Sequence, residues 1–411
     1  MTPIERLPAL THEAWLEIDL SALVNNAGVL RRAIPPSARL GLLVKANGYG
    51  HGLEMAARAA VVGGADLLIV AALDEGLALR AARMGAAVMV VYPTPPDAVA
   101  EAVLADLELS VSGLASTRRL LDAWDRRRES VAGRVLSLHV EVDTGMGRGG
   151  VAAESLPELV GLIDRQAAAR ILGVWSHLAN GSDPEVSGEQ VRRFDTAMAE
   201  LRAARGSVPP RHMVATEGIF AATAPAYDMV RVGLGFYGEL GVDFRPAAEW
   251  SSLAAELRPA MTVKARPVRL ESMRTGSPVG YGQEWTAERP SLIATLPIGY
   301  SDGWTRAYWP GAAALVRGRL VPLVGRVSMD SVCADVTDVE GVTLDDEVVL
   351  LGGQGSERIT PNDLARLRHS IPNEVFCAFG QRLPRVYLAD GRAVAVSRQA
   401  DRVERLAGSG W

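Results

Sequence analysis

Residues 40–62 read LGLLVKANGYGHGLEMAARAAVV, and this stretch carries one complete unit of strand, turn and helix. The apolar run at residues 40–45 is typical of a buried strand, and the alanine-rich run at residues 53–62 has the spacing of a helix. Between them lie three glycines, one tyrosine and one histidine. The strand therefore ends on Lys45 beside a glycine-rich turn, where a lysine is either a solvated surface residue or a nucleophile directed into a pocket.

This unit repeats along the first part of the chain. Further apolar, β-branched runs lie at residues 67–71, 88–92, 108–111, 134–142, 171–177, 211–215 and 228–233. Segments with helical spacing lie at residues 75–84, 115–128, 156–169 and 189–205. Eight strands, mostly separated by helices over about 200 residues, predict an α/β fold with an N-terminal (β/α)8 TIM-like barrel. The doubly wound sheet is the competing α/β arrangement.

The character of the sequence changes after about residue 253. Short strands alternate with glycine and proline turns at residues 261–273, 291–299, 312–339 and 346–353. We therefore expect a barrel domain over residues 1–252 and a mostly β C-terminal domain over residues 253–411, interrupted by a short helix near residues 361–368. The early strand at residues 15–20 is compatible with either part.

Composition excludes several classes of function. The formal net charge of −5 leaves no basic surface for nucleic acid, and the apolar runs stop well short of the roughly 20 residues that span a membrane. The N-terminal residues lack the apolar segment of a secretory signal. With only two cysteines, Cys333 and Cys377, and no export signal, we expect reduced thiols and a cytoplasmic protein.

Polar residues follow the ends of several predicted strands, where the chemistry of such a barrel is found. In the strand at residues 134–143, polar and apolar residues alternate, so one polar face should point into the barrel. Taken singly, each polar residue is compatible with a solvated or structural role, and only their common location at one end of the barrel favours function. The polar residues are Lys45, Glu141, Arg148, His177, Thr216 and Arg231. Gly233 and Leu234 follow Arg231 at the end of the eighth strand.

A lysine nucleophile, an aromatic residue beside it and a phosphate cradle together point to pyridoxal phosphate. The loops after the seventh and eighth strands of such barrels often hold a phosphate. Thr216 offers a hydroxyl there, and Gly233 and Leu234 offer backbone N–H groups. Lys45 would bind the cofactor covalently through its amine.

Seven motifs in order resemble one family. They are VKANGYGHG, DTGMGR, SHLA, DMVRVGLGFYG, VGYG, LPIGYSDGW and GRVSMD. Over about residues 14–390 the chain is similar to the alanine racemases, fold-type III pyridoxal-phosphate enzymes that interconvert L- and D-alanine. The resemblance implies that Lys45 carries the cofactor and is the base on the D face of the substrate. It also implies that Tyr49, Thr216, Gly233 and Leu234 bind the phosphate.

The resemblance further implies a homodimer with shared active sites. Tyr281 matches the second base, which acts on the L face from the partner subunit, and two groups on opposite faces of the α-carbon are what racemisation requires. Arg231 faces the pyridine nitrogen, and His177 lies between Arg231 and Tyr281. A phenol acts as a base near neutral pH only where positive charge favours its ionised form. Arg148 and the Met329 backbone N–H, the latter from the partner, hold the substrate carboxylate.

Three positions depart from the family pattern. Glu141 replaces a carbamylated lysine, and we expect its carboxylate to orient Arg148 through a bidentate pair. Thr216 replaces a phosphate-binding serine and keeps its hydroxyl. Gln381 replaces a tyrosine that lines the inner gate, which predicts a more polar pocket that accepts serine or another polar amino acid beside or instead of alanine.

Four alternatives remain open at this level. The first is a specialised racemase of a non-alanine amino acid in a biosynthetic pathway, which Gln381 and Thr216 favour. The second is a fold-type III amino-acid decarboxylase, which needs a protonating cysteine, for which Cys333 is the candidate. A non-enzymatic pyridoxal-phosphate carrier would lack the C-terminal β domain, and a barrel aldolase would use Lys45 without a cofactor.

Overall fold

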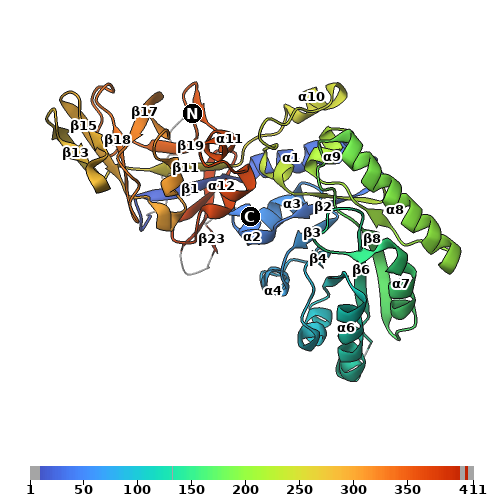
Figure 1. The fold of residues 1–411 in the computed structure, drawn as a ribbon. Coiled ribbons are helices and arrows are strands. Elements are labelled where there is room, and N and C mark those ends of the chain that lie inside the picture. The colour runs from blue at the N-terminus through green and yellow to red at the C-terminus, as the bar shows by residue number, and fades with distance from the viewer. Residues whose placement is uncertain (1–9, 132, 399–402, 406–411) are drawn as a thin grey trace.

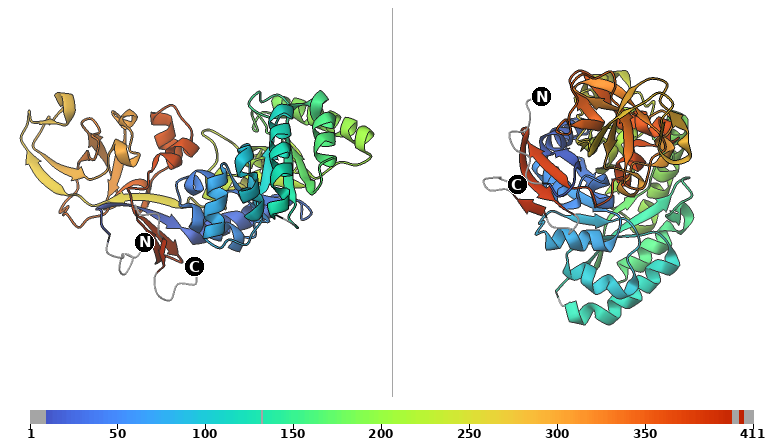
Figure 2. Two further views of the ribbon diagram at one scale, coloured as in Figure 1. Left: turned by 90° about the horizontal axis from the view of Figure 1, so that it is seen from below. Right: turned by 90° about the vertical axis from the view of Figure 1, so that its left-hand side faces the viewer.

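The chain forms two lobes that lie side by side and give an elongated molecule (Figures 1 and 2). The computed structural model describes residues 10–131, 133–398 and 403–405. One lobe is an α/β barrel and the other consists mostly of β-strands. No helix within these described ranges combines the length and the apolar character needed to cross a bilayer.

The barrel contains eight parallel strands that close into a ring. Pairing runs in the order β5–β4–β3–β2–β10–β9–β8–β6, and a further pairing between β5 and β6 closes the ring. This closure confirms the predicted barrel and rules out the open doubly wound sheet. The strands are β2 (Arg39–Leu43), β3 (Leu67–Val70), β4 (Val88–Val90), β5 (Glu108–Val111), β6 (Leu136–Asp143), β8 (Ala169–Trp175), β9 (Arg211–His212) and β10 (Met229–Val232); β7 (Val151–Ala152) adds to β6.

Helices cover the outside of the barrel (Figure 1). The predicted helix at residues 156–169 ends earlier, at Asp164, because Ala169 already belongs to β8. The helix predicted at residues 189–205 begins earlier, after Asp183, whose side chain accepts the backbone N–H groups of the first turn. These helices are α1 (Leu20–Arg32), α3 (Leu53–Val62), α4 (Leu73–Ala81), α5 (Val99–Leu104), α6 (Leu114–Arg127), α7 (Leu156–Asp164), α8 (Pro184–Arg205), α9 (Thr216–Phe220) and α10 (Ser251–Ala254).

The second lobe is built on one large sheet. Its order is β12–β15–β18–β17–β16–β19–β11–β1–β21–β22–β23, with β20 paired to β19. Strand β1 (Ala14–Asp19), whose place the sequence left open, lies inside this sheet between β11 and β21. A separate two-stranded sheet pairs β13 (Pro278–Val279) with β14 (Trp285–Thr286). The remaining strands of the large sheet are β11 (Met261–Ala265), β12 (Arg269–Met273), β15 (Ser291–Leu296), β16 (Ala313–Val316), β17 (Arg319–Val324), β18 (Val332–Asp335), β19 (Val348–Gln354), β20 (Glu357–Ile359), β21 (Arg385–Ala389), β22 (Arg392–Ser397) and β23 (Val403–Arg405).

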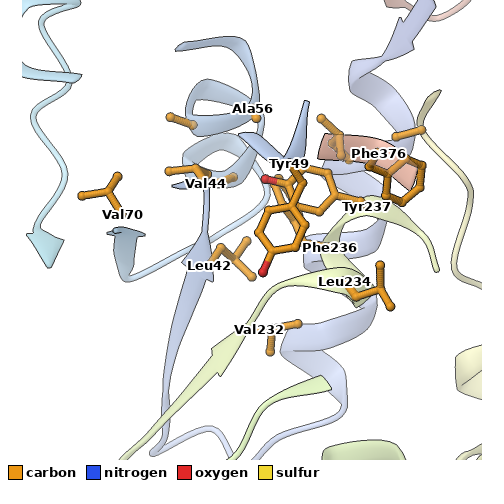
Figure 3. Packing of buried hydrophobic residues seen from close by; sticks show 14 of the residues in the cluster. Leu42, Val44, Tyr49, Ala56, Val70, Val232, Leu234, Phe236, Tyr237 and Phe376 are labelled. Atoms are coloured by element: carbon orange, nitrogen blue, oxygen red, sulfur yellow. The ribbon is translucent and has the colours of Figure 1, made fainter. Parts of the chain in front are cut away.

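Two short helices of the second lobe pack against the barrel. They are α11 (Pro361–Leu367), which matches the expected helix, and α12 (Pro372–Ala378). Phe376 of α12 joins a buried cluster with Tyr49 and Tyr237, whose rings are stacked at 4.9 Å (Figure 3). The Tyr237 hydroxyl donates to the Leu43 carbonyl at 2.9 Å, so this cluster fixes the end of β2 against the second lobe.

Candidate active site

The turn that follows β2 adopts a left-handed conformation. Lys45 begins this turn, and Ala46, Asn47, Gly48 and Tyr49 all have positive φ angles between 50° and 62°. Left-handed backbone costs about 1–2 kcal/mol for each residue with a side chain, and such strain is concentrated at functional sites. The surrounding structure therefore has to hold the turn in place.

Glycines and one histidine provide that support. A Cβ atom on Gly50 would lie 2.2 Å from the Phe376 carbonyl oxygen, and one on Gly52 would lie 2.0 Å from the Tyr387 hydroxyl. The buried His51 ring places Nδ1 within 2.9 Å of the Tyr49 carbonyl oxygen. These close approaches explain why the chain gives up side-chain bulk immediately after Lys45.

Lys45 lies partly buried at the mouth of the barrel among other cationic groups. Burial lowers the pKa of its amine, and the nearby charge of Arg148 lowers it further. A lowered pKa increases the fraction of neutral amine, which is the nucleophilic form. The geometry thus favours the nucleophile over a solvated surface lysine.

Arg231 is buried on β10 and is held on several sides. Its Nη2 donates to the Ser176 carbonyl at 2.7 Å and lies 3.3 Å from Nδ1 of His177. The guanidinium carbon lies 4.6 Å from the centre of the Trp175 ring. Burial lowers the pKa of Arg231 to about 9, and Arg148 adds to this effect, so the side chain stays protonated at neutral pH.

His177 is therefore a neutral ring with a defined tautomer. Burial, followed by the charges of Arg231, Arg148 and Lys45, lowers the pKa of His177 to about 3. Because a guanidinium can only donate, Nδ1 of His177 must be the acceptor. The proton of the neutral ring then sits on Nε2, the nitrogen directed away from Arg231.

A second chain of hydrogen bonds runs from Arg231 through the barrel interior. Nη1 of Arg231 lies 3.0 Å from Nδ1 of His212, and Nε2 of His212 lies 3.1 Å from Nδ1 of His139. Nε2 of His139 lies 2.8 Å from the Glu108 carboxylate. Since Arg231 can only donate and a carboxylate can only accept, both histidines are neutral with their protons on Nε2. Every bond in the chain then points from Arg231 to Glu108.

Glu141 lies on the same inward face of β6 as His139, as the alternation of that strand predicts. Burial raises the pKa of its carboxyl, whereas the charges of Arg148 and Arg231 oppose this change. Within the described residues no hydrogen bond or ion pair joins Glu141 to Arg148, so the expected bidentate pair is not formed in the single chain. The Arg148 side chain is exposed, and the Gly149 backbone lies against the Glu141 carboxylate instead.

The proposed phosphate cradle is brought together next to the turn after β2. A Cβ atom on Gly233 would lie 2.5 Å from the Tyr49 hydroxyl, so the missing side chain leaves this hydroxyl and the Gly233 backbone adjacent. Thr216 accepts the Gly235 backbone N–H at 3.2 Å. Among the described residues, the Gly233 N–H donates to no other protein group, and Leu234 follows at the start of a 3-10 helix. Hydroxyls and a free N–H fit a phosphate group.

Tyr281 and Met329 lie on the second lobe and belong to a different surface. Tyr281 is 67% exposed and Met329 is 54% exposed. Tyr281 follows β13, which lies at the end of the molecule farthest from the barrel (Figure 1). Gln381, in the exposed loop after α12, lines a 430 Å³ cavity together with Asn47 and Glu75.

The two cysteines occupy unequal positions. Cys333, the residue that the decarboxylase alternative requires, lies on β18 with its sulfur 3.8 Å from the Thr295 hydroxyl. Cys377 lies beside the barrel mouth, where burial raises the pKa of its thiol and the charge of Lys45 opposes this change. The cysteine near the lysine is thus not the one that the sequence indicated.

Sequence reasoning missed several residues of this site. The polar alternation of β6 placed His139 inside the barrel, but nothing in the sequence linked it to Glu108, His212 or Arg231. Glu75 was also missed, although its carboxylate accepts the Ala46 N–H at 2.6 Å and so holds the turn after Lys45. A buried histidine in a short strand was the only available signal for His212.

Comparisons with known proteins identify the family of the chain. The family profiles described as "Alanine racemase, N-terminal domain" and "Alanine racemase, C-terminal domain" match residues 18–241 and 260–387. The chain is 38% identical to the alanine racemase of Symbiobacterium thermophilum, over 91% of this chain and 96% of that one. It is 35% identical to alanine racemase 2 of Caldanaerobacter subterraneus subsp. tengcongensis, over 93% of this chain and 96% of that one.

A solved structure gives the same result. The crystal structure of alanine racemase from Bacillus anthracis with bound L-Ala-P superposes with a TM-score of 0.87 at 27% identity, covering 96% of this chain and 100% of that chain. Both parts of the chain are therefore matched, in order and nearly in full. The chain belongs to the alanine racemase family.

Proposed function

We propose that this protein is a pyridoxal-phosphate-dependent alanine racemase that works as a homodimer with two shared active sites. The observation that carries the proposal is the division of polar residues between the lobes. Lys45, His177 and Arg231 gather at the barrel mouth, whereas Tyr281 and Met329 are exposed on the other lobe. In this proposal, residues 1–252 hold the cofactor, and residues 253–411 donate Tyr281 and Met329 to the partner subunit.

The barrel residues fit the cofactor. Bound pyridoxal phosphate would supply an electron sink that makes the α-proton of the substrate acidic. Lys45 would hold it through its amine, and Tyr49, Thr216, Gly233 and Leu234 would bind its phosphate. Arg231 would face the ring nitrogen and, because it donates and keeps its own proton, would leave that nitrogen unprotonated.

Proton transfer would then use two groups on opposite faces of the α-carbon. Lys45 takes or returns the proton on the D face, and Tyr281 of the partner subunit does so on the L face. His177 directs its Nε2 proton away from Arg231, which suits a donor to the phenolate form of Tyr281. In the proposed dimer, Arg231 acting through His177 would supply the positive charge that a phenol base requires.

The substrate carboxylate would be held from both subunits. Arg148 offers a guanidinium from the barrel, and the Met329 backbone N–H comes from the partner. Glu141 influences Arg148 through space rather than through a direct hydrogen bond. We therefore retain Glu141 as an orienting residue that acts by charge.

Gln381 sets the expected substrate range. Gln381 is exposed and lines a cavity with the polar residues Asn47 and Glu75 and with apolar residues that include Leu53 and Leu79. We propose that the enzyme accepts serine or another polar amino acid in addition to alanine. The related alternative, a specialised racemase of a non-alanine amino acid, rests on the same residue, and a panel in which only alanine reacts would contradict both.

Deuterium exchange at the α-carbon tests the reaction and the substrate together. In D2O, both enantiomers of a substrate should gain deuterium and racemise. In Tyr281→Phe, D-alanine should still gain deuterium through Lys45 without conversion, whereas L-alanine should not exchange. Equal loss of exchange from both enantiomers would contradict the two-base assignment. Tyr92→Phe, which removes another exposed phenol with no assigned role, is the matched control.

Two further readouts separate the alternatives. An absorbance band near the visible edge that is lost on borohydride treatment distinguishes a cofactor-linked Lys45 from a barrel aldolase. Release of CO2 from any amino acid of the panel would indicate the decarboxylase, for which Cys377→Ala is then the informative variant because Cys377, unlike Cys333, lies beside Lys45.

A further inference from the structure

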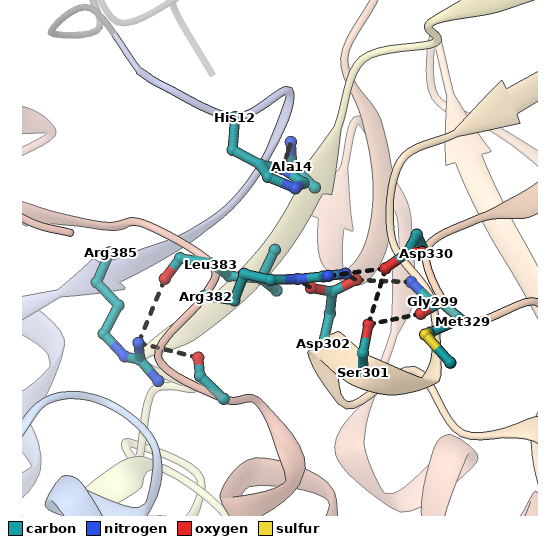
Figure 4. Close-up of polar contacts among 11 residues, drawn as sticks. His12, Ala14, Gly299, Ser301, Asp302, Met329, Asp330, Arg382, Leu383 and Arg385 are labelled. Carbon is teal, nitrogen blue, oxygen red and sulfur yellow. Dashed lines mark hydrogen bonds and ion pairs between the residues drawn. The ribbon is translucent and has the colours of Figure 1, made fainter. Parts of the chain in front are cut away.

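A cluster of charged side chains joins three loops of the second lobe, outside the barrel (Figure 4). Asp302, at the end of the 3-10 helix Tyr300–Asp302, is completely buried. Arg382 binds its carboxylate with two hydrogen bonds, from Nε at 2.6 Å and from Nη2 at 2.8 Å. The Gly299 N–H adds a third donor at 2.9 Å. A buried carboxylate with a bidentate arginine makes a rigid anchor.

The same guanidinium also reaches the turn that contains Met329. Nη1 of Arg382 donates to the Asp330 carboxylate at 2.7 Å. The Ser301 hydroxyl donates to the Met329 carbonyl at 2.7 Å and to Asp330 at 3.1 Å, and the Ser301 N–H also donates to the Met329 carbonyl. The turn is thus tied to Arg382 directly and to the loop before Asp302.

These contacts determine the direction of the Met329 N–H. The Tyr300 N–H donates to the Ser328 carbonyl at 3.1 Å, so this carbonyl faces the loop at residues 299–302. In a planar trans peptide the N–H points opposite to the C=O. The Met329 N–H therefore points away from the loop at residues 299–302. A Cβ atom on Gly299 would lie 2.4 Å from the Ser328 and Met329 carbonyl oxygens, so the two loops are in close contact.

We infer that Arg382 is a positioning residue for the active site of the partner subunit. It fixes the turn at residues 328–330 so that the Met329 N–H is presented outward, to the substrate carboxylate bound in the partner's barrel. This inference rests on the proposed function, since it requires Met329 to serve the partner. The competing idea is an effect on its own barrel through the neighbouring Gln381, which lines a cavity beside Asn47.

Arg382→Lys tests whether Arg382 has this role. Lysine keeps the charge but cannot bind Asp302 in bidentate fashion and reach Asp330 at the same time. Because the N–H would bind the carboxylate equally in the ground state and the transition state, we expect KM for alanine to rise about tenfold while kcat changes less than about twofold. Asp330→Ala, at an exposed position, should act in the same direction without threatening the fold. Unchanged KM in both variants would overturn the inference.

A matched control exists in the same lobe. Arg317 binds Asp346 in the same bidentate manner, with Nε at 2.8 Å and Nη2 at 2.9 Å, but it does not contact the Met329 turn. Arg317→Lys should leave KM and kcat unchanged. A rise in KM in this variant equal to that in Arg382→Lys would show that any weakened arginine pair has the effect, and would overturn the specific role of Arg382.

Hybrid dimers decide which subunit Arg382 serves. We would purify, with two different affinity tags, a dimer of one Lys45→Ala chain and one Arg382→Lys chain. Its only active site uses Lys45 of the Arg382→Lys chain and Met329 of the other chain, whose Arg382 is intact. We expect KM to return to the wild-type value. A KM that stays raised would place the effect of Arg382 within its own barrel and overturn the inference.

A calibrating hybrid separates this failure from failure of the proposed function. A dimer of one Lys45→Ala chain and one Tyr281→Phe chain contains one intact site only if the sites are shared between subunits. Restored activity in this hybrid supports the shared sites, so a raised KM in the Arg382 hybrid would then refute the positioning role alone. Absence of activity in the calibrating hybrid would refute the shared sites and the positioning role together.

Discussion

The chain of hydrogen bonds from Arg231 to Glu108 gives a prediction that does not depend on turnover. Glu108→Leu removes the acceptor at the end of the chain and leaves the Nε2 proton of His139, a residue that is 1% exposed, without a partner. The two histidines cannot escape by moving their protons to Nδ1. His212 would then present a proton to Arg231, another donor, at 3.0 Å.

The cost of this substitution is therefore that of one buried, unpaired donor. Such a group costs about 1–3 kcal/mol, which corresponds to a fall in the melting temperature of about 1–4 °C for a chain of this size. In Glu108→Gln the amide oxygen still accepts from His139, so this matched variant should lose about 1 kcal/mol or less. The difference in stability between Glu108→Leu and Glu108→Gln therefore measures the loss of the hydrogen-bond acceptor, because both variants lose the charge.

Two measurements check this reasoning. Differential scanning calorimetry of the protein gives the melting temperatures, and nitrogen-15 NMR of the six histidines reports which ring nitrogen carries the proton. We expect Nε2 protons on His139 and His212 in the wild type and in Glu108→Gln. A proton on Nδ1 of His212 in the wild type, or equal melting temperatures for Glu108→Leu and the wild type, would refute the derivation.

Three further predictions concern the barrel. Gly233→Ala places a Cβ atom 2.5 Å from a buried tyrosine hydroxyl, and this overpacking should weaken pyridoxal phosphate binding about tenfold in a fluorescence titration, whereas Gly188→Ala, in open space, should not. His51 and His177 have pKa values of about 3 in the fold against about 6.5 in the unfolded chain. The unfolding free energy should therefore fall as the pH drops from about 6.5 toward 3, and urea titration at several pH values measures this fall. Glu141→Gln should raise KM for alanine in steady-state assays more than it changes kcat, because its charge acts on a substrate-binding arginine.

Local patterns were enough to predict the barrel. Hydrophobic runs of strand length marked each of the eight strands, and the helix at Leu53–Val62 has the bounds that its spacing predicted. Helix α1 was not predicted, although an aspartate also caps its N-terminus: the Asp19 side chain accepts the Ala22 N–H. Strand β1 was predicted as a strand but not placed, because periodicity reports burial and does not identify the partner strands.

The site was predictable where its residues follow strand ends and unpredictable where it depends on contacts between distant strands. Lys45, His177 and Arg231 follow or end strands, so barrel geometry brings them together. Glu108, on β5, approaches His139 only because β5 and β6 are neighbours in the closed ring. The left-handed conformation of Ala46 and its neighbours is likewise set by contacts with α12 and β21, far along the chain.

The lowered pKa values at the barrel mouth have a common origin. Burial is the largest cause that lowers the pKa of Lys45, His177 and Arg231, and the charge of Arg148 lowers the pKa of all three further. Glu141 is the carboxylate that opposes the shift of Arg231. Cationic groups held close together repel one another unless anions balance their charge. Bound anions would balance these charges, and in the proposed function the cofactor phosphate and the substrate carboxylate would supply them.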